Sequence, residues 1–103
     1  MARLIYTARA LDDLERLADF LLEIDPAAAM DTGALIMEAV DVLRRHPLIG
    51  RPVESGLREL VISRGSSGYV ALYSVEQGHD AVLILAIRHQ REAGYTDEQG
   101  ERP

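Results

Sequence analysis

The chain has 103 residues, no cysteine and a formal net charge of −6, with 48% hydrophobic and 27% charged residues. This length suits one hydrophobic core and is too short for two, and the composition is that of a folded protein. The lack of cysteine excludes disulfides and thiolate metal sites. No apolar run reaches the roughly 18 residues that cross a bilayer, and no signal-peptide stretch follows Arg3. We therefore expect a cytoplasmic protein without a membrane partner.

The charge is unevenly distributed along the chain. Residues 1–46 contain five arginines and nine acidic residues, whereas residues 51–95 contain five of each. A protein that grips nucleic acid through its phosphates usually has a strongly basic surface. The net charge therefore argues against direct nucleic-acid binding, although the second half of the chain leaves room for a local positive patch.

The N-terminal segment predicts a strand followed by a helix. Residues 3–6 (RLIY) form a short apolar run that is typical of a strand, and Thr7 is suited to cap the helix that follows. Apolar residues then recur at helical spacing as far as Leu21, while polar residues that include Asp13 and Arg16 fill the other face. This helix should end before Asp25.

A second helix is predicted from Pro26 to about His46. Asp25 suits the N-cap, and proline is favoured at the first helical position. Positive charge in the last turn complements the helix dipole, and Pro47 ends the helix. Its apolar stripe consists of Leu35, Ile36, Ala39, Val40 and Leu43. The short connection between the two helices predicts an antiparallel hairpin.

The second half of the chain predicts three strands joined by turns. Residues 47–56 are rich in proline and glycine and predict a loop. The predicted strands span residues 57–62, 69–75 and 81–87, with turns at 65–68 and 76–80. Tyr69 and Tyr73 fall on one face of the middle strand, which predicts packing in or beside the core. The last strand is apolar without a break, which is typical of a central strand covered on both faces.

This order of elements predicts an α+β fold with the topology β-α-α-β-β-β. The helix hairpin should pack on one face of a small, curved, mainly antiparallel sheet. We expect a single domain over residues 1–95 and a polar C-terminal tail over residues 96–103.

Four segments, in this order and spacing, carry a resemblance to a known superfamily. They are residues 47–52 (PLIGRP), 56–61 (GLRELV), 68–73 (GYVALY) and 83–91 (LILAIRHQR). Together they resemble the RelE/ParE superfamily of bacterial toxin–antitoxin toxins over roughly residues 3–95. The HPLIGRP loop and the RELV strand are similar to those of the ParE, or plasmid-stabilisation, branch.

The resemblance implies a partner and a target. The partner is a cognate antitoxin whose C-terminal segment wraps and neutralises the toxin. RelE-like members cut messenger RNA in the ribosome, whereas ParE-like members act on DNA gyrase. The predicted function is therefore a toxin that inhibits DNA gyrase and needs no cofactor.

Two other functions stay open at this point. RelE-like nucleases place basic residues and a C-terminal Tyr or His around the reacting phosphate. At the position where those enzymes have arginine this chain has Val70, but His89, Arg91 and Tyr95 lie near the positions of their last catalytic groups. One alternative is thus a metal-independent endoribonuclease that uses these three residues. The other is a degenerate toxin that only binds its antitoxin.

Arginines of the second half are the predicted contacts with the antitoxin or the target. Arg58 and Arg64 flank a strand and are suited to bidentate pairs with a carboxylate-rich antitoxin tail. Arg88 and Arg91 are predicted to contact the target or the antitoxin. Arg51, between a glycine and a proline, is interpreted as fixing its loop by binding carbonyl groups.

No metal site is predicted. His46 and His79 have no acidic or histidine partners at ligand spacing.

Overall fold

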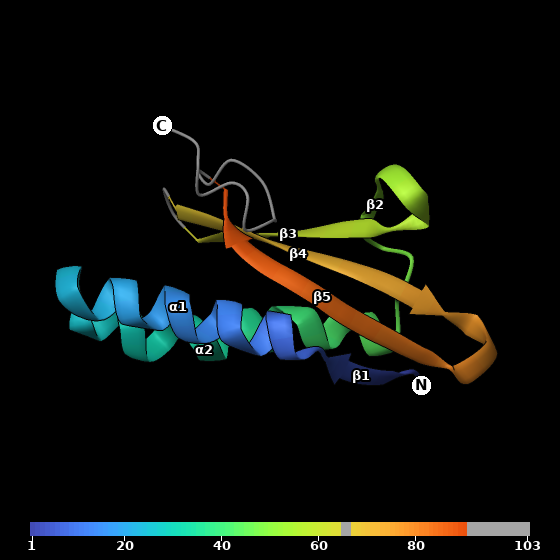
Figure 1. Cartoon of the computed structure of the whole chain (residues 1–103), viewed down its shortest axis with the longest axis horizontal. Coiled ribbons are helices and arrows are strands. Elements are labelled where there is room, and N and C mark those ends of the chain that lie inside the picture. The colour runs from blue at the N-terminus through green and yellow to red at the C-terminus, as the bar shows by residue number, and fades with distance from the viewer. Residues whose placement is uncertain (65–66, 91–103) are drawn as a thin grey trace.

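The computed structural model describes residues 1–64 and 67–90, apart from the side chains of residues 63, 64 and 67. Two helices lie along one face of a five-stranded sheet (Figure 1). The helices are α1 (Ala8–Ile24) and α2 (Pro26–Val40), and the strands are β1 (Arg3–Tyr6), β2 (Arg51–Pro52), β3 (Arg58–Arg64), β4 (Ser67–Glu76) and β5 (Ala81–His89). The predicted α+β fold with a helix hairpin on a mainly antiparallel sheet is confirmed. No helix among the described residues is long and apolar enough to span a membrane.

The sheet has the order β1-β5-β4-β3-β2. β1 runs parallel to β5, and the other neighbouring strands are antiparallel. The last strand, β5, therefore lies inside the sheet, as its apolar run predicts. A register shift between Leu72 and Tyr73 makes a bulge in the β4–β5 pairing, and such bulges increase local twist.

Both helix starts are capped as the sequence predicts. The Thr7 hydroxyl accepts a hydrogen bond from the Ala10 N–H at 3.2 Å, and Asp25 Oδ1 accepts one from the Ala28 N–H at 3.2 Å. The second helix differs from the prediction at its end. The α-helix stops at Val40, and a 3₁₀ turn follows over Asp41–Arg44. Tight 3₁₀ turns are common at helix ends, and here the turn contains the fully buried Leu43.

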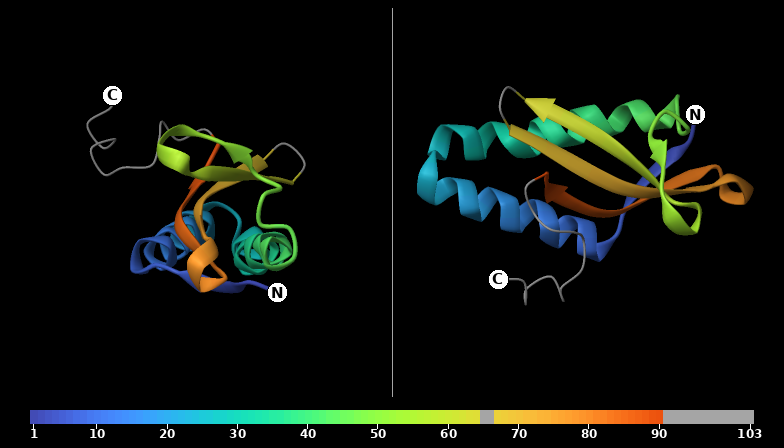
Figure 2. Two further views of the ribbon diagram at one scale, coloured as in Figure 1. Left: turned by 90° about the vertical axis from the view of Figure 1, so that its right-hand side faces the viewer. Right: turned by 90° about the horizontal axis from the view of Figure 1, so that it is seen from above.

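The core lies between the hairpin and the sheet, and Figure 2 shows both helices on the same side of the strands. Residues that face the helices alternate along β4, namely Tyr69, Ala71 and Tyr73, and all three are buried in the core. The predicted packing role of the two tyrosines is confirmed. From the α2 side the core receives Ile36 and Val40.

Two details depart from the sequence analysis. The region predicted as a plain loop contains the two-residue strand β2, where Arg51 lies directly opposite Glu59 of β3. Opposite charges on facing residues stabilise such a pair. Asp13, which was assigned to the polar face of the first helix, is instead buried because its carboxylate accepts a hydrogen bond from the backbone of β5.

Candidate functional site

The loop over residues 47–50 is fixed by side chains of the sheet. The Tyr73 hydroxyl donates a hydrogen bond to the Pro47 carbonyl at 2.7 Å and accepts one from the Gly50 N–H at 2.9 Å. A Cβ atom on Gly50 would lie 2.5 Å from the Tyr73 hydroxyl and 2.6 Å from the Glu59 carbonyl oxygen. Only glycine therefore fits at this crossing of the loop over the strands.

Burial raises the pKa of the Tyr73 hydroxyl, while the hydrogen bond from Gly50 and the charge of Arg58 oppose that rise. A tyrosine hydroxyl is protonated at neutral pH even at its ordinary pKa, and the raised pKa of Tyr73 extends this state to higher pH. It thus remains a donor to the Pro47 carbonyl, and the loop keeps both of its bonds to Tyr73.

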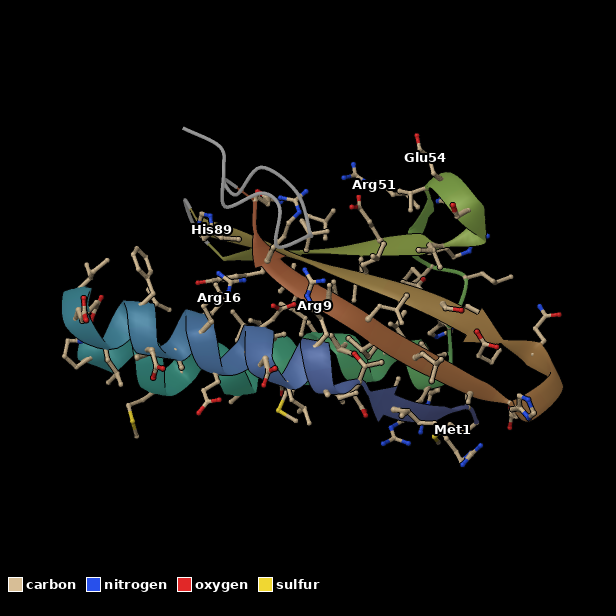
Figure 3. The ribbon with its side chains drawn as sticks, viewed as in Figure 1. Met1, Arg9, Arg16, Arg51, Glu54 and His89 are labelled. Carbon is tan, nitrogen blue, oxygen red and sulfur yellow. The ribbon has the colours of Figure 1, made fainter. Side chains whose placement is uncertain are left out.

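Arg58 completes the attachment of this loop. Its Nη1 donates to the Leu48 carbonyl at 3.1 Å and to the Gly50 carbonyl at 2.6 Å. The interpretation that Arg51 binds loop carbonyls is wrong, since Arg51 Nε and Nη2 both bind Glu59 Oε1, at 3.0 and 2.8 Å. The reason is the cross-strand register, which sets Arg51 opposite Glu59 and leaves the carbonyls to Arg58. Figure 3 shows Arg51 beside β2.

The fixed loop presents two apolar side chains. Leu48 and Ile49 are 54% and 58% exposed, although their backbone is anchored on both sides. Next to them is a pocket of about 180 Å³ that Ala2, Pro47, Leu48 and Val75 line together with the β4–β5 turn. An anchored loop with exposed apolar side chains is suited to contact a partner with little loss of conformational entropy.

The end of β5 carries the second group of predicted residues. Strand register places Arg88 beside Val70, on the face away from the helices, and places His89 beside Tyr69, on the face toward them. The His89 ring meets the Tyr69 ring edge to face, with centroids 5.3 Å apart. Arg88 Nη1 donates to the carbonyls of His89 and Gln90 at 3.1 and 3.3 Å. The side chains of Arg88 and His89 therefore lie on opposite faces of the sheet.

Val70 is 2% exposed and lies between Val61 and Arg88 in the sheet. Valine has no donor and no charge for a phosphate in any protonation state. Arg88 supplies the cation next to it, but its guanidinium also binds backbone carbonyls. Among the described residues, position 70 itself therefore offers no group that could stabilise a phosphate.

The structure separates the predicted contact arginines. Arg58 opposes Tyr73 on β4, whereas Arg88 opposes Val70, three residues away. That spacing is roughly 10 Å along a strand and puts the two side chains on opposite faces. Arg64 ends β3, with its side chain outside the description. Arg91 and Tyr95, together with the predicted tail over residues 96–103, lie outside the described residues.

Comparisons with known proteins show the family to which this chain belongs. A profile described as "ParE toxin of type II toxin-antitoxin system, parDE" matches residues 4–94. The chain belongs to the ParE toxin family. The ParE-like branch that the HPLIGRP and RELV segments indicate is therefore confirmed, and so is the wider RelE/ParE superfamily.

Relatives in sequence and in structure agree with this family. The chain is 40% identical to Toxin RelE3 of Caulobacter vibrioides over 84 residues, which are 82% of this chain and 89% of that protein. It is 28% identical to a chain of the chromosomal ParDE system of P. aeruginosa, with a TM-score of 0.73 over 86% of this chain and 96% of that one. A chain of the RelBE2 toxin–antitoxin complex of Mycobacterium tuberculosis is 26% identical, with a TM-score of 0.58 over 86% and 91%.

Within the ParE family, the chain is a toxin of a type II toxin–antitoxin system. The names of its relatives divide between RelE and ParE, so the cellular target does not follow from likeness alone.

Sequence reasoning missed two features of the site. The role of Tyr73 as the loop anchor was missed because a core tyrosine and a loop tyrosine have the same alternating pattern. Asp13 was missed because an acidic residue on an amphipathic helix usually faces water. A signal for Asp13 did exist, since Arg9, Asp13 and Arg16 recur at spacings of four and three and so share one face of α1.

Proposed function

We propose that this toxin inhibits DNA gyrase in the cytoplasm and that a cognate antitoxin holds it inactive. The observation that carries the gyrase target is the buried valine at position 70. Cleavage of RNA without a metal requires positive charge at the reacting phosphate, and Val70 stands where RelE-like nucleases have arginine. The profile match over residues 4–94 supports a toxin of the ParE family, and the gyrase target is our proposal for this toxin.

A different observation supports the proposal that the partner is an antitoxin. Large apolar side chains are more than half exposed around the tip of the helix hairpin, namely Phe20, Leu22, Ile24 and Met30. Phe20 and Ile24 are four residues apart on α1 and therefore share one face of the helix. An exposed apolar face of this kind is suited to contact a partner. Two of the solved relatives come from a ParDE system and from a RelBE2 toxin–antitoxin complex, which supports an antitoxin as the partner here.

Arginines are the proposed polar contacts. Arg88, at the end of β5, is the one we assign to the gyrase target, and Arg64 and Arg91 are proposed to bind carboxylates of the antitoxin. For Arg58 we propose an indirect role in partner binding, because its guanidinium already binds two loop carbonyls. It would shape the loop that presents Leu48 and Ile49 to the partner.

The proposal is tested by inducing the chain in bacteria without its partner, and again with the protein encoded beside it. We expect arrested growth, a DNA-damage response and intact messenger RNA in the first case, and normal growth in the second. Purified chain should also block supercoiling of relaxed plasmid by gyrase. Cleaved messages with unaffected gyrase would overturn the gyrase target, and the absence of any growth effect would favour the degenerate antitoxin-binding module.

A matched pair of variants sharpens this test. Arg88→Met removes the cation at the end of β5, and Arg45→Met removes an exposed cation beyond the end of α2. Both lower the positive charge equally. We expect Arg88→Met to weaken gyrase inhibition at least tenfold and Arg45→Met to leave it unchanged. Equal losses in both variants would mean that only net charge matters.

The second candidate function is the endoribonuclease. It is favoured by the 40% identity to a protein named Toxin RelE3 and by the histidine near the end of β5. In that case His89, Arg91 and Tyr95 would be the catalytic residues. Replacement of His89 by Gln would then abolish message cleavage, whereas a gyrase inhibitor would cleave no messages before or after the change.

A further inference from the structure

The strand β5 is longer than the strand that pairs with it on the α1 side. β1 pairs with β5 only as far as Tyr6, which lies opposite Ile84, whereas β5 continues to His89. Within the described residues, no strand accompanies the stretch from Leu85 to His89 on that side. Its backbone N–H and C=O groups still need partners, because buried backbone groups without hydrogen bonds are costly.

Helix α1 and its N-cap residue Thr7 supply these partners through side chains. The Thr7 hydroxyl donates to the carbonyls of Ile84 and Leu85 at 3.0 and 3.3 Å. One turn and a half further along the helix, Asp13 Oδ2 accepts from the Ile87 N–H at 2.8 Å, and Arg16 Nη2 donates to the Ile87 carbonyl at 3.4 Å. An acceptor and a donor on the same strand residue are what a neighbouring strand would offer.

The carboxylate in this arrangement is nearly covered. The Asp13 side chain is 10% exposed and lies 3.7 Å from both Arg9 Nε and Arg16 Nη2. Two guanidinium groups thus balance the buried charge. Figure 3 shows Arg9 and Arg16 reaching from α1 toward β5. Of the two, Arg16 has a hydrogen bond to β5 among the described contacts.

Ile87 immediately precedes the two polar residues of the strand end. Because side chains alternate between the faces of a sheet, the orientation of Ile87 determines the faces on which Arg88 and His89 lie. We propose that Asp13 is a positioning residue that, together with Arg16, fixes Ile87 and thereby the presentation of Arg88 and His89. This inference rests on the proposed function of the strand end as a contact surface for the target.

A purely structural role would make a different prediction. If Asp13 only held α1 on the sheet, its replacement would lower stability and toxicity together, and the conformation of the strand end would not change in the molecules that remain folded. A positioning role predicts a local change at Ile87 and His89 in folded molecules. The two roles therefore differ in local readouts and not in overall stability.

The test uses ¹⁵N-labelled chain with a matched pair of arginine variants. Arg16→Met and Arg9→Met each remove one ion pair of Asp13, from side chains that are 48% and 41% exposed, so both should fold. We expect the Ile87 amide to exchange with solvent about tenfold faster in Arg16→Met, with shifted His89 ring resonances. Arg9→Met should change the exchange and the growth inhibition much less, because Arg9 has no hydrogen bond to β5 among the described contacts. Unchanged exchange and His89 resonances in Arg16→Met would overturn the proposal.

A second pair tests Asp13 itself. Asp13→Asn keeps an oxygen that can accept from Ile87, whereas Asp13→Ala removes it. We expect Asn to retain protection of the Ile87 amide and most of the growth inhibition, and Ala to lose both at least fivefold beyond any loss of folded protein. Equal behaviour of Asn and Ala would contradict the positioning role. If the wild-type chain does not inhibit growth, the proposed function fails, but the amide exchange still decides whether Asp13 positions the strand.

Discussion

Two regions of this toxin carry its candidate contacts, and they are built in different ways. The loop over residues 47–50 is held by an uncharged hydroxyl and one arginine, which come from the sheet itself. The end of β5 is held by a carboxylate and a guanidinium, which come from a helix. The loop has no strand pairing, and the end of β5 is paired only on its β4 side. In both regions side chains supply hydrogen bonds that a neighbouring strand would otherwise make. The comparison teaches that single residues, rather than long sequence patterns, shape the candidate contact regions of this protein.

The two regions should also fail differently. At the loop, the limiting factor is space, because the backbone crosses Tyr73 without room for a Cβ atom. At β5, the limiting factor is the supply of hydrogen-bond partners for the edge that faces α1, where β1 no longer pairs with the strand. Four changes, ordered from the largest expected effect to the smallest, test this difference.

Replacement of Gly50 by Ala should be the most damaging. The new Cβ would lie within 2.7 Å of two Tyr73 atoms and of the Glu59 carbonyl oxygen, so the loop must move off the sheet. We expect the free energy of unfolding to fall by about 3 kcal/mol, as measured by urea denaturation. Gly78→Ala is the matched control, because its Cβ would meet nothing within 4 Å. A neutral Gly50→Ala would show that the loop is not tightly seated.

Replacement of Tyr73 by Phe should cost about 2 kcal/mol of unfolding free energy, because the Gly50 N–H and the Pro47 carbonyl each lose a buried partner. Tyr69→Phe is the control, since the described contacts give its hydroxyl no hydrogen bond. That variant should stay within about 0.5 kcal/mol of the wild type. Equal effects of the two changes would contradict the anchoring role of Tyr73.

Replacement of Thr7 by Ala tests the other region at its first contact. The hydroxyl caps α1 and donates to two β5 carbonyls, so its loss should cost about 1 kcal/mol. Thr7→Ser keeps the hydroxyl and should recover most of that loss in the same denaturation experiment. If Thr7→Ser is as unstable as Thr7→Ala, the methyl group of Thr7 rather than its hydroxyl contributes the stability.

The smallest effect should appear only in alkali. Burial raises the pKa of Tyr73, so the unfolded chain loses this proton first as the pH rises past about 10. The folded state is therefore destabilised at high pH and unaffected at neutral pH. Burial, with some help from the Asp41 carboxylate, also raises the pKa of Tyr6. We expect the thermal midpoint to fall more steeply above pH 10 in the wild type than in Tyr73→Phe, and parallel curves would contradict this.

Most of the fold could be predicted from the sequence. Apolar spacing, the caps at Thr7 and Asp25 and the alternation along β4 are local signals, and each was confirmed. The branch within the superfamily was also predictable, because it depends on short segments such as HPLIGRP. The candidate site was less predictable. Arg51 and Arg58 were assigned partly exchanged roles, because the sequence does not reveal which arginine faces an acidic residue across two strands.

The sequence by itself determined the elements, their order and the family, since these depend on residues close together along the chain. Only the tertiary structure decided what the polar residues do. In the folded protein Asp13 is buried and binds the Ile87 N–H, Gly50 packs against Tyr73, and Arg88 lies beside Val70. The physical reason is that a side chain's role depends on which backbone groups lack a partner nearby. Which backbone groups lack a partner depends on how strands of unequal length pack against the helix and the loop in the folded protein.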